Sequence, residues 1–197
     1  MPTTINGTTG VSLVANNATI NTPAISGGTL TSSTLVTPTM SGTVTGLSSA
    51  SMPAGSVVQV VQSSYSTFTS SSSSSYADTG LSASITPSSA SNKVLVFASM
   101  VGVGKNTGNC RVALRLVRNS TTIEDFSTET AMSPWNTTTQ VDVGTTSCII
   151  LDSPATTSST TYKVQIASNG NVTQTFVNNV NGSTEVGCTM TLMEIKV

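Results

Sequence analysis

Histidine is absent from the 197 residues, and charged residues make up only 8% of them, against roughly 25% in an ordinary globular domain. Without histidine, the most common general base and the usual partner of a catalytic serine are missing. The Gly-x-Ser-x-Gly motif of serine hydrolases does not occur either. These absences exclude hydrolases of the serine-triad type, and we expect no enzymatic activity.

Clustered positive charge and long apolar runs are also missing. The formal net charge is −1, and no apolar stretch approaches 18 residues. Binding to nucleic acid or to an anionic membrane requires clustered Lys and Arg, and a membrane-spanning helix requires a longer apolar run. The chain does not start with a charged and then apolar signal segment. We therefore expect no nucleic acid partner, no membrane insertion and no classical secretion.

Cysteine is scarce, with Cys110, Cys148 and Cys188 widely spaced along the chain. An odd number of cysteines without Cys-x-x-Cys or histidine favours buried free thiols over a zinc site or a disulfide framework. Calcium loops of the Asp-x-Asp-x-Asp type are absent as well. The sequence thus predicts no metal and no cofactor.

Ser, Thr, Asn and Gly occupy the places that charged residues usually take. Hydroxyl side chains compete with the helix for backbone groups, whereas Thr, Val and Ile suit a half-buried sheet. Disorder is disfavoured because 37% of the residues are hydrophobic and the net charge is low. The composition predicts an all-β protein.

The first 52 residues differ from the rest of the chain. Before Lys93 the one charged side chain is Asp78, and a six-residue Thr-Pro pattern at 22–27 returns at 37–42. Apolar residues recur there every five positions, at Ile20, Ile25, Leu30, Leu35 and Met40. So thin a repeat cannot bury its apolar row alone and needs identical neighbours. We interpret residues 1–52 as a repeat-like shaft or virion attachment segment, with a flexible Ser/Thr linker as the alternative.

Residues 53–197 have the pattern of a β-sandwich. Runs rich in Val, Ile and Thr are separated by turn signals, and Ser70 to Ser75 is predicted as a surface loop. The expected strands lie at 56–62, 77–86, 93–103, 110–118, 121–126, 140–151, 161–167 and 184–197. In the last one, Cys188, Met190 and Leu192 alternate with polar residues, as a sheet with one apolar face requires. Their number and spacing favour a sandwich or jelly roll.

Several strings in this region are similar to those of phage proteins. They are Pro53 to Gln62 (PAGSVVQVVQ), Asp78 to Ser82 (DTGLS), Ile85 to Val96 (ITPSSASNKVLV), Leu151 to Pro154 (LDSP) and Met190 to Ile195 (MTLMEI). Residues 53–197 resemble the short β-sandwich heads of tail-fibre and virion proteins of marine and cyanobacterial phages. Such heads resemble the jelly-roll trimers of the tumour necrosis factor and complement head superfamily. The resemblance implies a homotrimer with the last strand near the threefold axis.

Two polar segments are candidate contacts with a host surface. The lone tryptophan, Trp135, stands beside Asn136 in a segment containing Pro134, and an aromatic ring in such a place can stack on a sugar or anchor an interface. Capping the core edge or the trimer seam is the alternative. The amides of Asn169 and Asn171 suit sugar hydroxyls, although ordinary turn preference explains them equally well.

Carboxylate and arginine side chains provide the remaining chemistry. A glycan hydrolase needs two facing carboxylates, and the candidates are Glu124 and Asp125, Asp142 and Asp152, which we expect at exposed turns and strand edges. A second set, Arg111, Arg115 and Arg118, favours a solvated face or ion pairs between subunits.

The sequence favours a virion structural protein, assembled in the host cytoplasm: a trimeric fibre or spike subunit that attaches through its N-terminal segment and contacts the host with its head. A capsid decoration or head fibre protein is the alternative, and a fibre-borne glycan hydrolase is the remote one.

Overall fold

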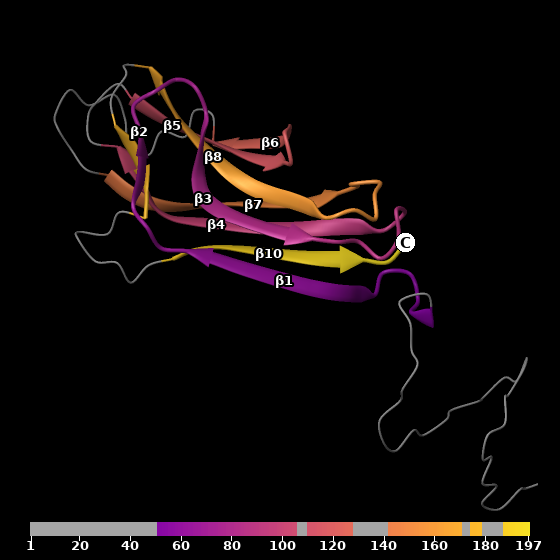
Figure 1. Cartoon of the computed structure of the whole chain (residues 1–197). Helices are drawn as coiled ribbons and strands as arrows, with labels where there is room; N and C mark the ends of the chain where they lie inside the picture. Colours follow the sequence, from indigo (N-terminus) through magenta and orange to yellow (C-terminus); the bar gives the residue numbers. More distant parts are fainter. Residues whose placement is uncertain (1–50, 106–109, 128–141, 171–173, 179–186) are drawn as a thin grey trace, which may run out of the picture. The chain divides into compact units, whose positions relative to one another are not determined.

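The computed structural model describes residues 51–105, 110–127, 142–170, 174–178 and 187–197, so the predicted shaft lies almost entirely outside the described residues. The described residues form ten strands and no α-helix (Figure 1). The strands are β1 (Val57–Tyr65), β2 (Thr69–Ser71), β3 (Ala77–Ile85), β4 (Lys93–Lys105), β5 (Cys110–Arg118), β6 (Thr121–Ser127), β7 (Asp142–Asp152), β8 (Thr160–Gly170), β9 (Thr175–Val177) and β10 (Cys188–Ile195). No helix in these ranges is long and apolar enough to cross a membrane.

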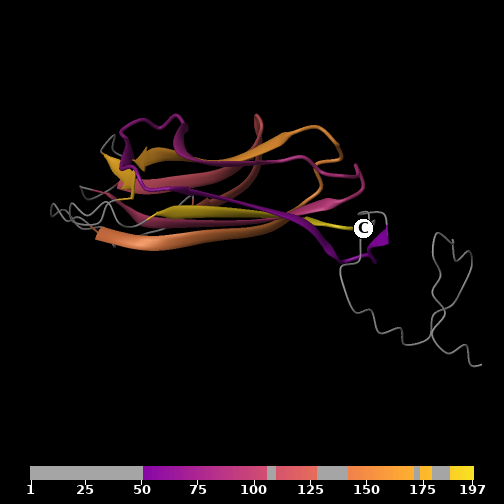
Figure 2. The ribbon, with the colours of Figure 1, turned by 60° about the horizontal axis from the view of Figure 1, so that its bottom comes forward.

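The strands form two antiparallel sheets. In the first, called sheet A, β10 lies between β1 and β4, β7 pairs with the other edge of β4, and the short β9 and β2 extend the sheet beside the end of β4. Sheet B has the order β3-β8-β5-β6. The chain crosses repeatedly between the two sheets, which stack as two layers (Figure 2). The expected all-β sandwich is confirmed, and its connectivity is consistent with a jelly roll.

The core lies between the sheets and follows from the period of two along each strand. Inward positions of β4, β10, β8 and β5 are nearly all apolar and fully covered. They include Val94, Val96, Ala98, Met100, Cys188, Met190, Leu192, Tyr162, Val164, Ile166, Val112, Leu114 and Leu116. In β10 the buried and half-buried residues alternate from Cys188 to Ile195, as the sequence predicts.

Two local predictions were wrong. The serine run from Ser70 to Ser75 was expected to be a surface loop, and residues 72–75 are one, but Ser70 and Ser71 belong to β2, where they pair with Phe176 and Thr175 of β9. Asn169 was expected in a turn, but β8 continues through Gly170. In both places a neighbouring strand supplies backbone hydrogen bonds that outweigh the local turn preference of Ser and Asn.

The two ends of the sandwich differ. At one end the entering and leaving chains pair, since Gly55 N donates to Lys196 O at 2.8 Å and Lys196 N donates to Ser56 O at 2.9 Å. The strand ends that flank residues 106–109, 128–141, 171–173 and 179–186 lie at the opposite end (Figure 1). We call the first the attachment end, after the attachment role that the sequence predicts for the N-terminal segment, and the second the far end.

Candidate functional site

Three of the four predicted contact residues lie outside the described part of the chain. Trp135, Asn136 and Asn171 lie outside the described residues, on the connections after β6 and after β8. Asn169 is in the last part of β8, where its backbone pairs with Arg111 of β5. The topology therefore places the strand ends on both sides of these residues at one end of the sandwich, and their role as contacts remains a prediction.

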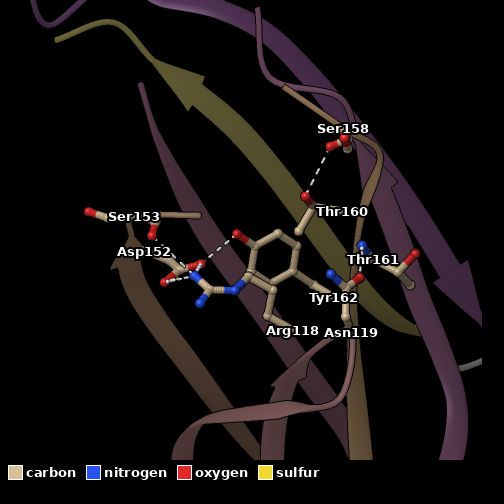
Figure 3. Close-up of polar contacts among 8 residues, drawn as sticks. All are labelled: Arg118, Asn119, Asp152, Ser153, Ser158, Thr160, Thr161 and Tyr162. Atoms are coloured by element: carbon tan, nitrogen blue, oxygen red, sulfur yellow. Dashed lines mark hydrogen bonds and ion pairs between the residues drawn. The ribbon is translucent and has the colours of Figure 1, made fainter. Parts of the chain in front are cut away.

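Asp152 is not an exposed acid, which corrects the expectation from sequence. Its side chain is 10% exposed, and its two oxygens lie 2.7 and 2.6 Å from Arg118 Nη1. The hydroxyl of Tyr162 donates to the same carboxylate at 2.6 Å (Figure 3). Burial, and next the bond to Asp152, raise the pKa of the Tyr162 hydroxyl far above its usual range. This cluster joins β5, β7 and β8 across the two sheets, and its acid is fully engaged.

Arg118 is held in place by the tight turn that follows it. Asn119 has φ of 52°, a left-handed conformation in which Asn is several-fold enriched. Its backbone N–H donates to Thr161 O at 2.7 Å, and its side-chain oxygen accepts from Thr161 N at 3.0 Å (Figure 3). The turn thus locks the β5–β6 hairpin to β8. Arg118, for which the sequence predicted a solvated face or an ion pair between subunits, pairs with Asp152 of its own chain.

The outer face of sheet B carries a network of charged and polar side chains. Asp78 accepts from Lys163 Nζ at 2.9 Å and from Gln165 Nε2 at 2.6 Å. Gln165 accepts in turn from Arg115 Nε at 2.9 Å, and the Arg115 guanidinium lies 4.0 Å from the centre of the Tyr76 ring. Partial burial acts to raise the pKa of Asp78, but the bonds from Gln165 and Lys163 and the Lys163 charge outweigh it and lower that pKa. These side chains make the outer face of sheet B polar.

The two remaining candidate acids whose side chains are described, Glu124 and Asp125, do not face each other as a pair for glycoside hydrolysis. Glu124 and Asp125 are both exposed and lie opposite Leu116 and Arg115 of β5, on different faces of β6. The side chain of Asp142 lies outside the described residues. In the described parts of the chain, no three His, Cys, Asp or Glu side chains gather as metal ligands.

A buried carboxylate that sequence analysis missed lies at the attachment end. Glu194 is 0% exposed. One of its oxygens accepts from Ser88 N (2.7 Å), Ser88 Oγ (2.8 Å) and Asn92 Nδ2 (2.6 Å), and the other accepts from Gln59 Nε2 (2.6 Å). Burial acts to raise the pKa of Glu194, but these donors outweigh it and lower the pKa. The signal was in the sequence, because Glu194 continues the inward series of Cys188, Met190 and Leu192.

The Glu194 cluster fastens three segments together. It joins β1 through Gln59 and the β3–β4 connection through Ser88 and Asn92 to β10. Asn92 Oδ1 also accepts from the backbone of Val197 at 3.3 Å. The cluster therefore stabilises the end of the sandwich where the N-terminal segment enters.

Two of the three cysteines are buried free thiols, as predicted. Cys148 and Cys188 are 5% and 0% exposed and unpaired, and the side chain of Cys110 is outside the described residues. Burial, and next the charge of Glu124, raise the pKa of Cys148 to about 11. The thiol at this position is thus a core group.

The outer face of sheet A contrasts with that of sheet B. Two cross-strand rows run over its four long strands. One row consists of Val60, Met193, Leu95 and Leu151, and the next of Gln62, Thr191, Phe97 and Ile149. Ile149 and Val60 are 65% and 56% exposed. The following row is formed by hydroxyls, from Ser64 to Ser147, and Lys93 lies at the attachment margin. This face is apolar in its centre and nearly free of charge.

Comparison with known proteins leaves the family open. No family model matches the chain, and no curated protein matches it. Among solved structures, the chain is similar to the dimeric latent PorU from Porphyromonas gingivalis, at 8% identity and a TM-score of 0.25. The match covers 73% of this chain but only 14% of that chain.

Proposed function

We propose that this protein is a non-enzymatic structural protein of a phage virion, a fibre or spike subunit whose head projects from the particle and contacts the host surface. The observation that carries the proposal is the polarity of the sandwich. Both the entering chain and the C-terminus lie at the attachment end, held by backbone bonds between Gly55, Ser56 and Lys196. A head fastened there presents its far end outward.

The far end has the connections suited to recognition. Binding residues concentrate on loops that a rigid scaffold positions, and the strand ends on both sides of residues 106–109, 128–141, 171–173 and 179–186 all lie there. Asn169 lies in the last part of β8 at this end, and Trp135, Asn136 and Asn171 belong to segments whose flanking strands end there, so host glycan or protein contacts are proposed for all four. The partner at the other end is another virion protein, reached through residues 1–52.

Three identical chains are the proposed assembly state. The apolar residues that recur every five positions between Ile20 and Met40 require identical neighbours to be covered. Three copies of a weak contact at the far end also multiply its strength, because the second and third contacts form at high effective concentration.

Immunogold electron microscopy of phage particles that carry this gene tests the proposal, with antibodies raised against the purified full chain. We expect gold at the distal parts of fibres or spikes, and we expect the purified chain to block adsorption of the phage. Gold on the capsid without blocking would indicate a decoration protein instead. Particles that bind no gold would refute a virion location.

A matched variant localises the contact. Trp135→Ala is expected to lose the blocking of adsorption, whereas Thr122→Ala, an exposed position on β6, is expected to keep it. Equal blocking by both variants would remove Trp135 from the contact surface.

A further inference from the structure

The N-terminal segment reaches the head through a strand at the edge of sheet A. The chain enters at Gly55 and Ser56 and continues directly into β1, which runs from the attachment end to the far end (Figure 1). Within the described residues, β10 is the one strand that pairs with β1. A force that residues 1–52 transmit to the head therefore enters sheet A through the β1–β10 pair.

The proposed function sets the direction of that force. A head that is fastened at one end and bound to a host at the other is pulled between the entry of β1 and the far end. A tethered body turns until these two points line up with the pull, so the load lies along β1. The ladder between β1 and β10 extends from the Val57–Ile195 pair to the Tyr65–Cys188 pair. Because antiparallel hydrogen bonds are perpendicular to their strands, such a load shears all of them at once.

A pull between the two chain ends acts on the same strands in a different way. Gly55 N donates to Lys196 O at 2.8 Å and Lys196 N donates to Ser56 O at 2.9 Å, so the end of β10 lies beside the start of β1. Separating these neighbours opens the ladder from that end, one residue pair after another. The two strands are thus strong against a load along β1 and weak against a load that separates the chain ends.

Side chains reinforce β1 near its start. Gln59 Nε2 donates to Glu194 at 2.6 Å and to Thr86 O at 2.7 Å, which joins β1 to β10 and to the connection after β3. Gln62 Nε2 donates to Thr191 Oγ1 at 3.2 Å across the same pair of strands. These bonds add to the backbone ladder at the end where the load enters.

An aromatic ring holds β1 at its other end. Tyr65, the last residue of β1, packs against the core, and its ring lies so near Gly80 of β3 that a Cβ added there would overlap it. The Tyr65 hydroxyl lies 3.3 Å from Thr69 Oγ1, which donates to Thr79 O at 2.9 Å. Drawing β1 toward the attachment end would pull this ring away from sheet B. β1 is therefore held near both of its ends.

We infer that the β1–β10 pair is a mechanical clamp, which resists a pull along β1 between the particle and the far end and yields to a pull that separates the two chain ends. The inference rests on the proposed function for the direction of its load and adds the part of the head that bears it. Gln59, Glu194 and Tyr65 are the side chains that reinforce it.

Force measurements on single full-length molecules test the inference in two directions. Handles at Ala54→Cys and Thr145→Cys pull along β1, from its entry to the start of β7 at the far end. Handles at Ala54→Cys and Val197→Cys pull the chain ends apart. These three positions are exposed, the buried thiols of the core are shielded, and both proteins carry Cys110→Ser. We expect the first unfolding event to need at least about twice the force along β1, because the bonds of the ladder then share the load.

Two variants test the reinforcement. Gln59→Ala removes the amide that joins β1 to Glu194 and is expected to lower the force along β1. The control is Ser84→Ala, which removes a bond to Thr161 within sheet B, outside the path of the load, and is expected to keep the wild-type force. Should Gln59→Ala fail to fold, Gln62→Ala at an exposed position takes its place with a smaller expected loss of force.

Equal forces in the two directions, or a greater force between the chain ends, would overturn the inference. Equal forces along β1 for Gln59→Ala and Ser84→Ala would overturn the role given to the amide. Neither result bears on the virion location, which immunogold labelling decides. Particles that bind no gold would refute that location and leave the measured strength of the β1–β10 pair as it is.

Discussion

Replacing Glu194 by Gln exchanges one carboxylate oxygen of the buried cluster for an NH₂ group, and so measures how much that oxygen contributes to the stability of the fold. The oxygen that accepts from both groups of Ser88 and from Asn92 can be matched by the amide oxygen of Gln. The new amide NH₂ then meets Gln59 Nε2, at a distance of 2.6 Å in the wild type, so two donors face one another. Rotating the Gln59 amide would remove the conflict but would lose its bond to Thr86 O at 2.7 Å.

In the first arrangement the new buried NH₂ group has no acceptor, and in the second the half-buried Gln59 amide loses its bond to Thr86 O. Leaving a buried polar group unsatisfied costs about 1–3 kcal/mol, and we expect Glu194→Gln to lower the free energy of unfolding by that amount at pH 7. Glu194→Ala, which removes the acceptor from all four bonds, is expected to cost more than Glu194→Gln, because several buried donors then lack a partner.

The difference in stability between the wild type and Glu194→Gln is expected to change with pH in one direction. The pKa of Glu194 is lower in the folded state than in the unfolded chain, where it is about 4.3. Its ionisation therefore stabilises the fold above about pH 4.3, and this contribution is lost as the pH falls through the folded pKa. Asp78 has a lowered pKa too, but it is present in both proteins and cancels. The difference between wild type and Glu194→Gln should thus shrink in acid.

Urea unfolding of the full chain at pH 7 and at pH 3.5, followed by circular dichroism at one protein concentration, measures both effects. The control is Glu124→Gln on exposed β6, which is expected within about 0.5 kcal/mol of the wild type. A Glu194→Gln protein as stable as the control at pH 7, or a difference that grows in acid, would refute the reasoning.

Two further predictions test the core and its margin. Gly80 has φ of 100°, and an added Cβ would lie 2.2 Å from the Tyr65 ring. Gly80→Ala should therefore lower the free energy of unfolding in urea by about 1–3 kcal/mol. The control Gly187→Ala, whose nearest contact would be 3.9 Å away, should lower it little. Burial and a pKa of about 11 protect Cys148, so peptide mapping after iodoacetamide at pH 8 should find it unmodified in native protein and modified in urea; labelling of native protein would contradict its burial.

Much of the fold was predictable because sheet burial has a period of two. The alternation from Cys188 to Leu192 indicated which face of β10 enters the core, and the structure confirms it. Asn119 and Ser120 separate two strands whose Val, Leu and Thr content indicated β-structure on both sides. These sequence patterns are local, and they predict the strands correctly because packing in the core favours the same strands.

Other features depend on contacts distant in sequence and were not predictable. The short strands β2 and β9 are 104 residues apart in their Ser71–Thr175 pairing, and each is too brief to carry a periodic signal. Asp152 depends on Arg118 and Tyr162 from two other strands. The local sequence around a single carboxylate is the same whether its side chain is exposed to solvent or is paired with an arginine.

The structure shows where the few charged residues lie. A low count alone suggests only that solubility rests on hydroxyls and amides. In the structure, Asp152 and Glu194 serve internal clusters, and Asp78, Lys163 and Arg115 supply sheet B with its hydrated surface. Few charges remain for the outer face of sheet A, where Ile149 and Val60 are exposed instead. The same small number of charged residues thus gives sheet B a hydrated outer face, while the outer face of sheet A has an apolar centre with Lys93 at its margin.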